Sequence, residues 1–197
     1  MVNRTQSTSK LVKLIILALL GTVSLLLFFL NFPLPMLPPF LKIDFSDVPA
    51  VLAAFMFSPL AGVIVVGIKN LLYFAVSGAS DPIGVAANFL AGVMFTVPVA
   101  IVYHKYKKGV KTIVSGLVVG TVVMAIGMTV LNYFVMLPLY SIFMGWGNMG
   151  TSEKMAFALK GVLPFNILKG IVVGILFVPL YVKMRSWIDK KRSGFAS

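Results

Sequence analysis

Long runs of apolar residues, separated by short polar or basic segments, dominate this sequence of 197 residues. A helix needs about 20 mostly apolar residues to cross the hydrocarbon core of a bilayer. Hydrophobic residues make up 59% of the chain, a surplus over the roughly 45–50% of soluble domains that one water-facing core cannot hold. We therefore predict an all-α integral membrane protein, a single membrane domain over residues 1–197, with six transmembrane helices at about residues 12–31, 48–57, 60–76, 83–103, 111–140 and 162–184.

The second of these segments is the shortest. Residues 48–57 are too few to cross a bilayer alone, and Pro59 separates them from the third segment. The two segments therefore read either as separate helices or as one broken hairpin. The first apolar run follows a basic flank, but it is long for a signal peptide and no clear Ala-x-Ala site follows it, so we interpret it as a retained helix.

Basic residues are distributed unevenly between the two sides of the predicted bundle. If the N-terminus is cytoplasmic, twelve Lys and Arg side chains lie in the inner segments, while Lys42, Lys154 and Lys160 lie in the outer ones. Inner loops of membrane proteins carry such an excess, so we expect both termini in the cytoplasm and an even number of crossings. The inner twelve are Arg4, Lys10, Lys13, Lys105, Lys107, Lys108, Lys111, Lys183, Arg185, Lys190, Lys191 and Arg192.

Charge and composition also exclude several classes of function. A formal charge of +12 can indicate nucleic-acid binding, but these charges flank apolar runs, so lipid explains them better and no nucleic-acid partner is expected. There is no cysteine and one histidine, His104, in a Lys-rich loop, so we expect neither a metal site nor a cofactor. No catalytic motif is present, and Gly62–Lys69 lacks the ending of a P-loop, so we predict no enzymatic activity.

Amide and ammonium side chains lie at a similar depth in four of the predicted helices, in the outer half. Lys169 is seven residues inside the sixth helix, about 10 Å below its outer end. Asn166 shares that face of the helix, and Asn132 lies about as deep in the fifth helix. The other members of the layer are Lys69, Asn70 and Asn88.

Polar groups inside a membrane are costly unless they face a cavity or a partner. One interpretation of the layer is an outward-open pocket with apolar walls and a few convergent polar groups, and the other is hydrogen bonding between helices. We favour the pocket for Lys169 with Asn166 and leave both interpretations open for the single asparagines. For Lys69 we favour an ion pair with Asp47 or Asp81.

The first outer loop carries three of the charges, Lys42, Asp44 and Asp47. Because five prolines, Pro33, Pro35, Pro38, Pro39 and Pro49, stiffen the stretch around it, we predict a lid over an outer pocket. A competing interpretation is a helix start, with Ser46 or Asp47 as N-cap and Pro49 in the first turn. That interpretation does not account for Lys42 or Asp44.

Several segments resemble the riboflavin-specific substrate-binding (S) components of energy-coupling factor (ECF) transporters, the RibU type. The likeness covers about residues 10–190. It is carried by Leu30-Asn-Phe-Pro33, Leu41-Lys-Ile-Asp-Phe-Ser-Asp-Val-Pro49, Ile68-Lys-Asn70, Ala87-Asn-Phe89, Leu131-Asn-Tyr133 and Pro164-Phe-Asn-Ile-Leu-Lys-Gly170.

The resemblance implies a six-helix S-component fold in a bacterial cell membrane, with riboflavin captured on the outer side as a transported ligand. It implies that Asn132, Asn166 and Lys169 contact the flavin. It further implies partners, a transmembrane coupling protein and two ATPase subunits, which agrees with the missing P-loop. S components often carry Ala-x-x-x-Ala in the first helix for docking, whereas this chain has Ala18-x-x-x-Thr22, so the docking face stays open.

A flavin ring is a flat apolar body with one imide edge of donors and acceptors, which asparagine amides and the Lys169 ammonium can match. We expect Asp44 from the first loop to take part in binding, and Phe45, Tyr133 and Phe165 to stack on or edge the ring. Two alternatives are an S component for another small vitamin and a self-sufficient secondary carrier.

Overall fold

The computed structural model describes residues 2–35, 37, 41–78, 80–107, 109–145 and 147–196, with side chains for residues 10–188 of these ranges. Pro38, Pro39 and the side chains of Arg4, Lys108, Lys190, Lys191 and Arg192 lie outside the described part. The elements are α1 (Val2–Phe29), β1 (Phe32–Pro33), β2 (Lys42–Ile43), α2 (Asp47–Met56), α3 (Pro59–Val76), α4 (Pro82–Lys105), α5 (Val110–Leu131), η1 (Asn132–Met136), α6 (Leu137–Phe143), α7 (Thr151–Phe157), η2 (Ala158–Val162) and α8 (Leu163–Ala196).

The described part of the chain contains five helical stretches that are long and apolar enough to cross a membrane. They are Lys10–Phe29, Pro59–Val76, Pro82–Lys105, Val110–Phe143 and Thr151–Ile188. They correspond to five of the predicted segments. The second predicted segment is α2, which has 10 residues, all of them buried. Six helical segments are therefore present as predicted, but α2 is not a spanning helix of its own because it is too short.

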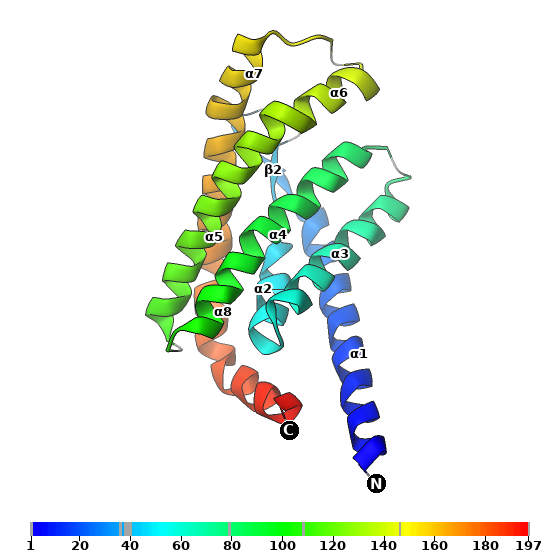
Figure 1. The fold of residues 1–197 in the computed structure, drawn as a ribbon, viewed down its shortest axis with the longest axis vertical. Helices are drawn as coiled ribbons and strands as arrows, with labels where there is room; N and C mark the ends of the chain where they lie inside the picture. The colour runs from blue at the N-terminus through cyan, green and yellow to red at the C-terminus, as the bar shows by residue number, and fades with distance from the viewer. Residues whose placement is uncertain are drawn as a thin grey trace.

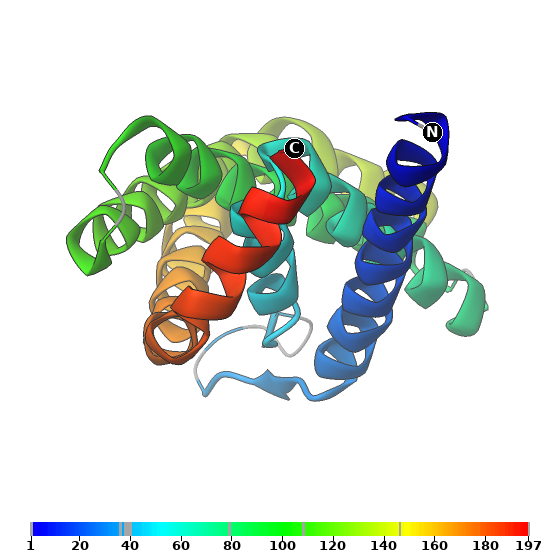
Figure 2. The same cartoon turned by 90° about the horizontal axis from the view of Figure 1, so that it is seen from below.

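Both chain ends lie at one end of the bundle, whereas α6 and α7 lie at the other, called the distal end below (Figure 1). Ends on the same side require an even number of passes along the bundle. The extended residues around β2 and the short α2 together make the second pass. Because α2 packs against α1, α3, α4 and α8 and lies between α1 and α8 in Figure 2, protein surrounds an irregular stretch that lipid does not tolerate.

Three details differ from the sequence prediction. The last helical stretch begins at Thr151 instead of residue 162, because the π-helical turn η2 joins α7 to α8 without a break. The first helix begins at Val2 instead of residue 12. His104 belongs to the last turn of α4 and not to a loop, and its Nε2 lies 2.8 Å from the carbonyl oxygen of Ala54 in α2.

Two π-helical turns lie next to the predicted site. Asn132 is the first residue of η1, and η1 contacts η2. Each turn ends two residues before a proline, Pro138 or Pro164. Proline has no N–H to donate to the preceding turn, which favours a wider turn at that point. Such turns occur frequently at functional sites.

Glycines bring α4, α5 and α8 close together around the site. A Cβ at Gly120 in α5 would lie 2.7 Å from the carbonyl oxygen of Phe95 in α4. A Cβ at Gly170 in α8 would collide with the side chain of Thr121 in α5. Small residues permit this close approach between membrane helices, and it fixes the three helices that carry most of the predicted polar layer.

Candidate ligand-binding site

A cavity of about 290 Å³ lies toward the distal end of the bundle. Small-molecule sites typically measure roughly 300–1,000 Å³, so this cavity is at the small end of that range. Its walls come from the end of α1, the β2 segment, α3, α4, α5, η1, α6, η2 and α8. The polar side chains along it are Asn31, Lys42, Tyr73, Asp81, Asn88, Asn132, Tyr140, Asn166 and Lys169.

A larger groove of about 820 Å³ runs along α5 and α8, but its chemistry is different. Aliphatic side chains such as Val118, Ile171 and Ile175 line it, and all three are strongly exposed on the side of the bundle. A groove without convergent polar groups gives a ligand no orientation. The distal cavity is therefore the candidate site.

Four of the seven site residues predicted from the sequence line the distal cavity. They are Asn132 at the start of η1 and Phe165, Asn166 and Lys169 in the first turns of α8. Asn166 and Lys169 are only 3% and 2% exposed. The predicted pocket therefore brings together polar side chains from α5–η1 and α8, with Phe165 on its apolar wall.

The other three predicted residues lie outside the cavity wall. Asp44 is buried behind it, and one of its carboxylate oxygens accepts a hydrogen bond from the Ser46 N–H at 2.9 Å. The ring of Phe45 lies 6.1 Å from that of Phe32, in a tilted arrangement. The ring of Tyr133 lies edge-on to its neighbour in the chain. Asp44, Phe45 and Tyr133 are therefore not on the described cavity wall, and their contact with a ligand stays a prediction.

The cavity asparagines are oriented by their own helices. The Nδ2 of Asn132 donates to the carbonyl oxygen of Met128 at 2.8 Å, and the Nδ2 of Asn166 donates to that of Val162 at 2.8 Å. A carbonyl oxygen can only accept, so each amide must turn its nitrogen toward the helix. The amide oxygens then remain as acceptors for a ligand. Asn88, also on the wall, has an amide oxygen with no hydrogen-bond partner among the described residues.

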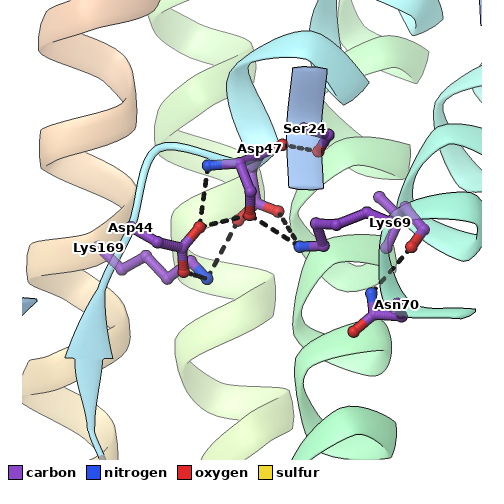
Figure 3. A network of polar contacts seen from close by, with 8 residues as sticks. Ser24, Asp44, Asp47, Lys69, Asn70 and Lys169 are labelled. Atoms are coloured by element: carbon purple, nitrogen blue, oxygen red, sulfur yellow. Dashed lines mark hydrogen bonds and ion pairs between the residues drawn. The ribbon is translucent and has the colours of Figure 1, made fainter. Parts of the chain in front are cut away.

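Lys169 belongs to a buried ion-pair network as well as to the cavity (Figure 3). Its Nζ lies 3.1 Å from Asp44 Oδ2 and 3.3 Å from Asp47 Oδ2. Lys69 Nζ lies 3.4 Å from Asp47 Oδ1. These four side chains are at most 3% exposed. The network therefore balances two carboxylates with two ammonium groups, which reduces the cost of burying the charges.

Serine hydroxyls tie the network to α1 and to the start of α2. Lys69 Nζ donates to Ser46 Oγ at 2.8 Å, Ser46 Oγ donates to Asp44, and Ser24 Oγ in α1 donates to the carbonyl oxygen of Ser46. Of the two partners predicted for Lys69, Asp47 is the observed one. Ser46 occupies the N-cap position of α2, but its side chain makes no capping hydrogen bond because it is committed to this network.

Sequence reasoning missed a second polar pair on the cavity wall. Asp81 caps α4 by accepting the Gly84 N–H at 2.7 Å, and the Tyr140 hydroxyl donates to its two oxygens at 3.2 and 3.0 Å. Asp81 before Pro82 is a recognisable helix start. The 59-residue separation from Tyr140 left no sequence signal for the pair.

The chain matches known proteins over most of its length. Residues 12–181 match the family model described as ECF transporter, substrate-specific component. The chain is 40% identical over 186 residues to the riboflavin transporter FmnP of Bacillus subtilis (strain 168), covering 93% of this chain and 97% of that protein. It is 42% identical over 178 residues to the riboflavin transporter RibU of Staphylococcus aureus (strain TCH60), covering 90% and 93%.

The fold leads to the same family. A solved structure described as the S component of a bacterial ECF transporter is similar with a TM-score of 0.77 and 41% identity, covering 91% of this chain and 98% of that chain. These relatives are membrane transport proteins and not enzymes, so the predictions of a membrane protein without enzymatic activity are confirmed. The resemblance found from the sequence segments is confirmed too, and the chain belongs to the substrate-specific components of ECF transporters.

Proposed function

We propose that this chain captures riboflavin at the distal cavity, from the outer side of the membrane, as the substrate-binding subunit of an ATP-driven uptake system. The observation that carries the proposal is the convergence of Asn88, Asn132, Asn166 and Lys169 on one small cavity. The relatives named riboflavin transporters support the choice of ligand. The apolar stretch of wall that includes Ala91, Met128 and Val162 suits a flat ring.

The polar groups match the imide edge of a flavin. That edge presents an N–H between two carbonyl oxygens, so it needs at least one acceptor and one donor from the protein. The amide oxygens of Asn132 and Asn166 supply acceptors. An ammonium group has three N–H donors. Asp44 accepts one from Lys169, and Asp47 takes up a second direction as an ion-pair partner at 3.3 Å. The third is then available for a flavin carbonyl.

The ion pairs also prepare Lys169 for binding. A free lysine side chain loses about 0.5–1.5 kcal/mol of conformational freedom when a ligand immobilises it. Lys169 is 2% exposed and already held by Asp44 at 3.1 Å. Little of that cost remains at the moment of binding, which favours a high affinity for the ligand.

The partners we propose are a transmembrane coupling protein and two ATPase subunits. The chain carries no P-loop motif, so the energy of ATP must enter through other subunits. On α1, Gly21 packs against Ile68 and Ser24 bonds to Ser46, whereas Ala18 and Thr22 remain exposed.

A transport assay tests the need for partners. Vesicles that contain this chain alone should accumulate no riboflavin, whereas vesicles with a self-sufficient carrier would accumulate riboflavin under an ion gradient.

We further propose that both termini lie in the cytoplasm. The end of the bundle that holds the termini also carries Lys105, Lys107 and Lys111. Basic residues are favoured in the inner loops of membrane proteins, so this end is assigned to the inner side. The chain has no cysteine, so single cysteines report topology cleanly. A membrane-impermeant maleimide should label Ser152→Cys and not Lys107→Cys in intact cells, and the reverse pattern would contradict this orientation.

The direct test of the function is ligand binding by the purified chain. We expect the protein in detergent to carry the yellow absorption of a bound flavin, or to quench the fluorescence of added riboflavin with one ligand per chain. Thiamine and biotin should not compete. A chain that ignores riboflavin but binds another vitamin would be an S component of different specificity, and the proposal would be wrong.

A further inference from the structure

We infer that Asp81 and Tyr140 form a second polar subsite in the distal cavity, which binds the hydroxyl groups of the flavin side chain and selects ligands that carry a polyol. This inference rests on the proposed function, because it assumes that a flavin occupies the cavity. It adds a specificity-determining pair that the predicted imide contacts do not include.

The cavity has two polar levels that are separated along its helices. Asp81, the N-cap residue of α4, precedes Asn88 by seven positions, about 10 Å at 1.5 Å per residue. On the continuous stretch α5–η1–α6, Tyr140 follows Asn132 by eight positions, about 12 Å on the same scale. Two independent helices thus give a similar spacing. The Asp81–Tyr140 level is the more distal one, because α6 and the start of α4 lie at that end (Figure 1).

The distal pair has the chemistry to receive hydroxyl groups. A carboxylate offers about four lone-pair positions, and the described hydrogen bonds to the Asp81 carboxylate come from the Gly84 N–H and the Tyr140 hydroxyl. Asp81 therefore keeps acceptor capacity on the cavity wall. Gly84 has no side chain there, and a Cβ would collide with the Asp81 carboxylate and lie 2.9 Å from the Tyr140 hydroxyl. The glycine leaves the pair accessible from the cavity.

A polyol fits this subsite better than another flat ring. Each hydroxyl donates one hydrogen bond and accepts others, so a chain of hydroxyls can donate to Asp81 while it accepts from neighbouring groups. A flavin carries its polar groups in two sets, the imide edge and the hydroxyls of the side chain, which lie apart from each other. The two levels of the cavity correspond to these two sets.

The experiment compares riboflavin with lumiflavin, which has the same ring but a methyl group in place of the polyol. Both are titrated into the parent, Asp81→Asn, Tyr140→Phe and the control Tyr106→Phe, an exposed tyrosine away from the cavity. Asn is as good an N-cap as Asp, so α4 keeps its start. We expect roughly ten- to hundredfold weaker riboflavin binding in Asp81→Asn, with lumiflavin changed by less than about twofold.

The outcomes separate this inference from the proposed function. Equal losses for both ligands in Asp81→Asn and Tyr140→Phe would mean that the pair only supports the fold, and unchanged riboflavin binding would mean that it does not touch the side chain. Either result overturns the subsite and leaves the proposed function standing. A parent chain that binds neither ligand overturns the proposed function itself.

Discussion

Lys169 and Asp44 are 125 positions apart in the chain, yet the ammonium nitrogen of one lies 3.1 Å from a carboxylate oxygen of the other. The contact joins α8 to the stretch that leads into α2. Because Lys169 also lines the cavity, the same side chain belongs to the buried network and to the cavity wall. The position of Asp44 therefore suits a role in orienting Lys169, and its direct contact with a ligand stays a prediction.

Asp44→Asn should weaken riboflavin binding through Lys169. The amide carries no charge to hold the ammonium, so the third N–H of Lys169 loses its direction toward the cavity. We expect about tenfold weaker binding, an effect of about 1.4 kcal/mol, measured by quenching of riboflavin fluorescence.

The control for that change is to make Asp44→Asn in a chain that already carries Lys169→Met. Once the ammonium is absent, adding Asp44→Asn should alter the affinity by less than about twofold, because residues that act through one interaction are not additive. Fully additive losses in the double variant would show that Asp44 affects binding by another route.

The single change Lys69→Met should destabilise the fold more than the double change that removes the charges of both Lys69 and Asp47. The single change leaves two buried carboxylates with one ammonium, and breaking a buried ion pair typically costs about 3–5 kcal/mol. Lys69→Met combined with Asp47→Asn keeps the Asp44–Lys169 pair balanced. We expect its unfolding temperature in detergent to recover most of the loss, while exposed Lys160→Met has little effect. A double variant less stable than Lys69→Met would contradict this charge balance.

Asn132→Ala and Asn166→Ala should each reduce riboflavin affinity by about tenfold, since a hydrogen bond contributes about 0.5–1.5 kcal/mol. Asn70→Ala is the control, because Asn70 makes the same bond to its own helix, from Nδ2 to the Val66 carbonyl oxygen at 2.8 Å, but does not line the cavity. Titration of the three variants checks the pocket. A loss of the same size in Asn70→Ala would mean that all three amides act by stabilising their helices and not by contacting the ligand.

Gly170→Ala should destabilise the packing of α8 on α5. The new methyl group collides with Thr121, and overpacking costs about 1–3 kcal/mol. Thr121→Ala in the same chain should restore much of the unfolding temperature. Gly174→Ala one turn later is the control, since its Cβ would meet Leu117 at an ordinary 3.7 Å. If Thr121→Ala gives no rescue, close contact at this point is not the cause.

The sequence predicted those parts of the fold that depend on local composition. Apolar runs located the helices, and polar residues inside them located the cavity at Asn132, Asn166 and Lys169. Neither prediction needs a knowledge of which helices are neighbours. Phe45 and Tyr133 do not line the cavity. Aromatic residues are abundant here, and residue type alone does not distinguish a cavity wall from a lipid-facing or packed surface.

Partners in space were harder to predict than positions in depth. From the sequence, Asp81 was offered only as a possible partner of Lys69, and Tyr140 had no predicted partner. Only the packing of α4 against the distal end of α5–η1–α6 brings the two together. The early start of the last helix was missed for a different reason. The predicted helix began at residue 162, whereas the π-helical turn η2 joins α7 to α8 and lets the helical stretch continue past Pro164.

The complete burial of α2 has a consequence for how the protein is made in the membrane. A helix of ten residues without a lipid-facing side chain is too short to be inserted as a stable span. Its environment exists only after α8 has joined α1, α3 and α4, although α8 is synthesised last. Biogenesis of this protein is therefore expected to end with a cooperative step, in which α2 becomes buried only when α8, the last helix to be synthesised, packs against it.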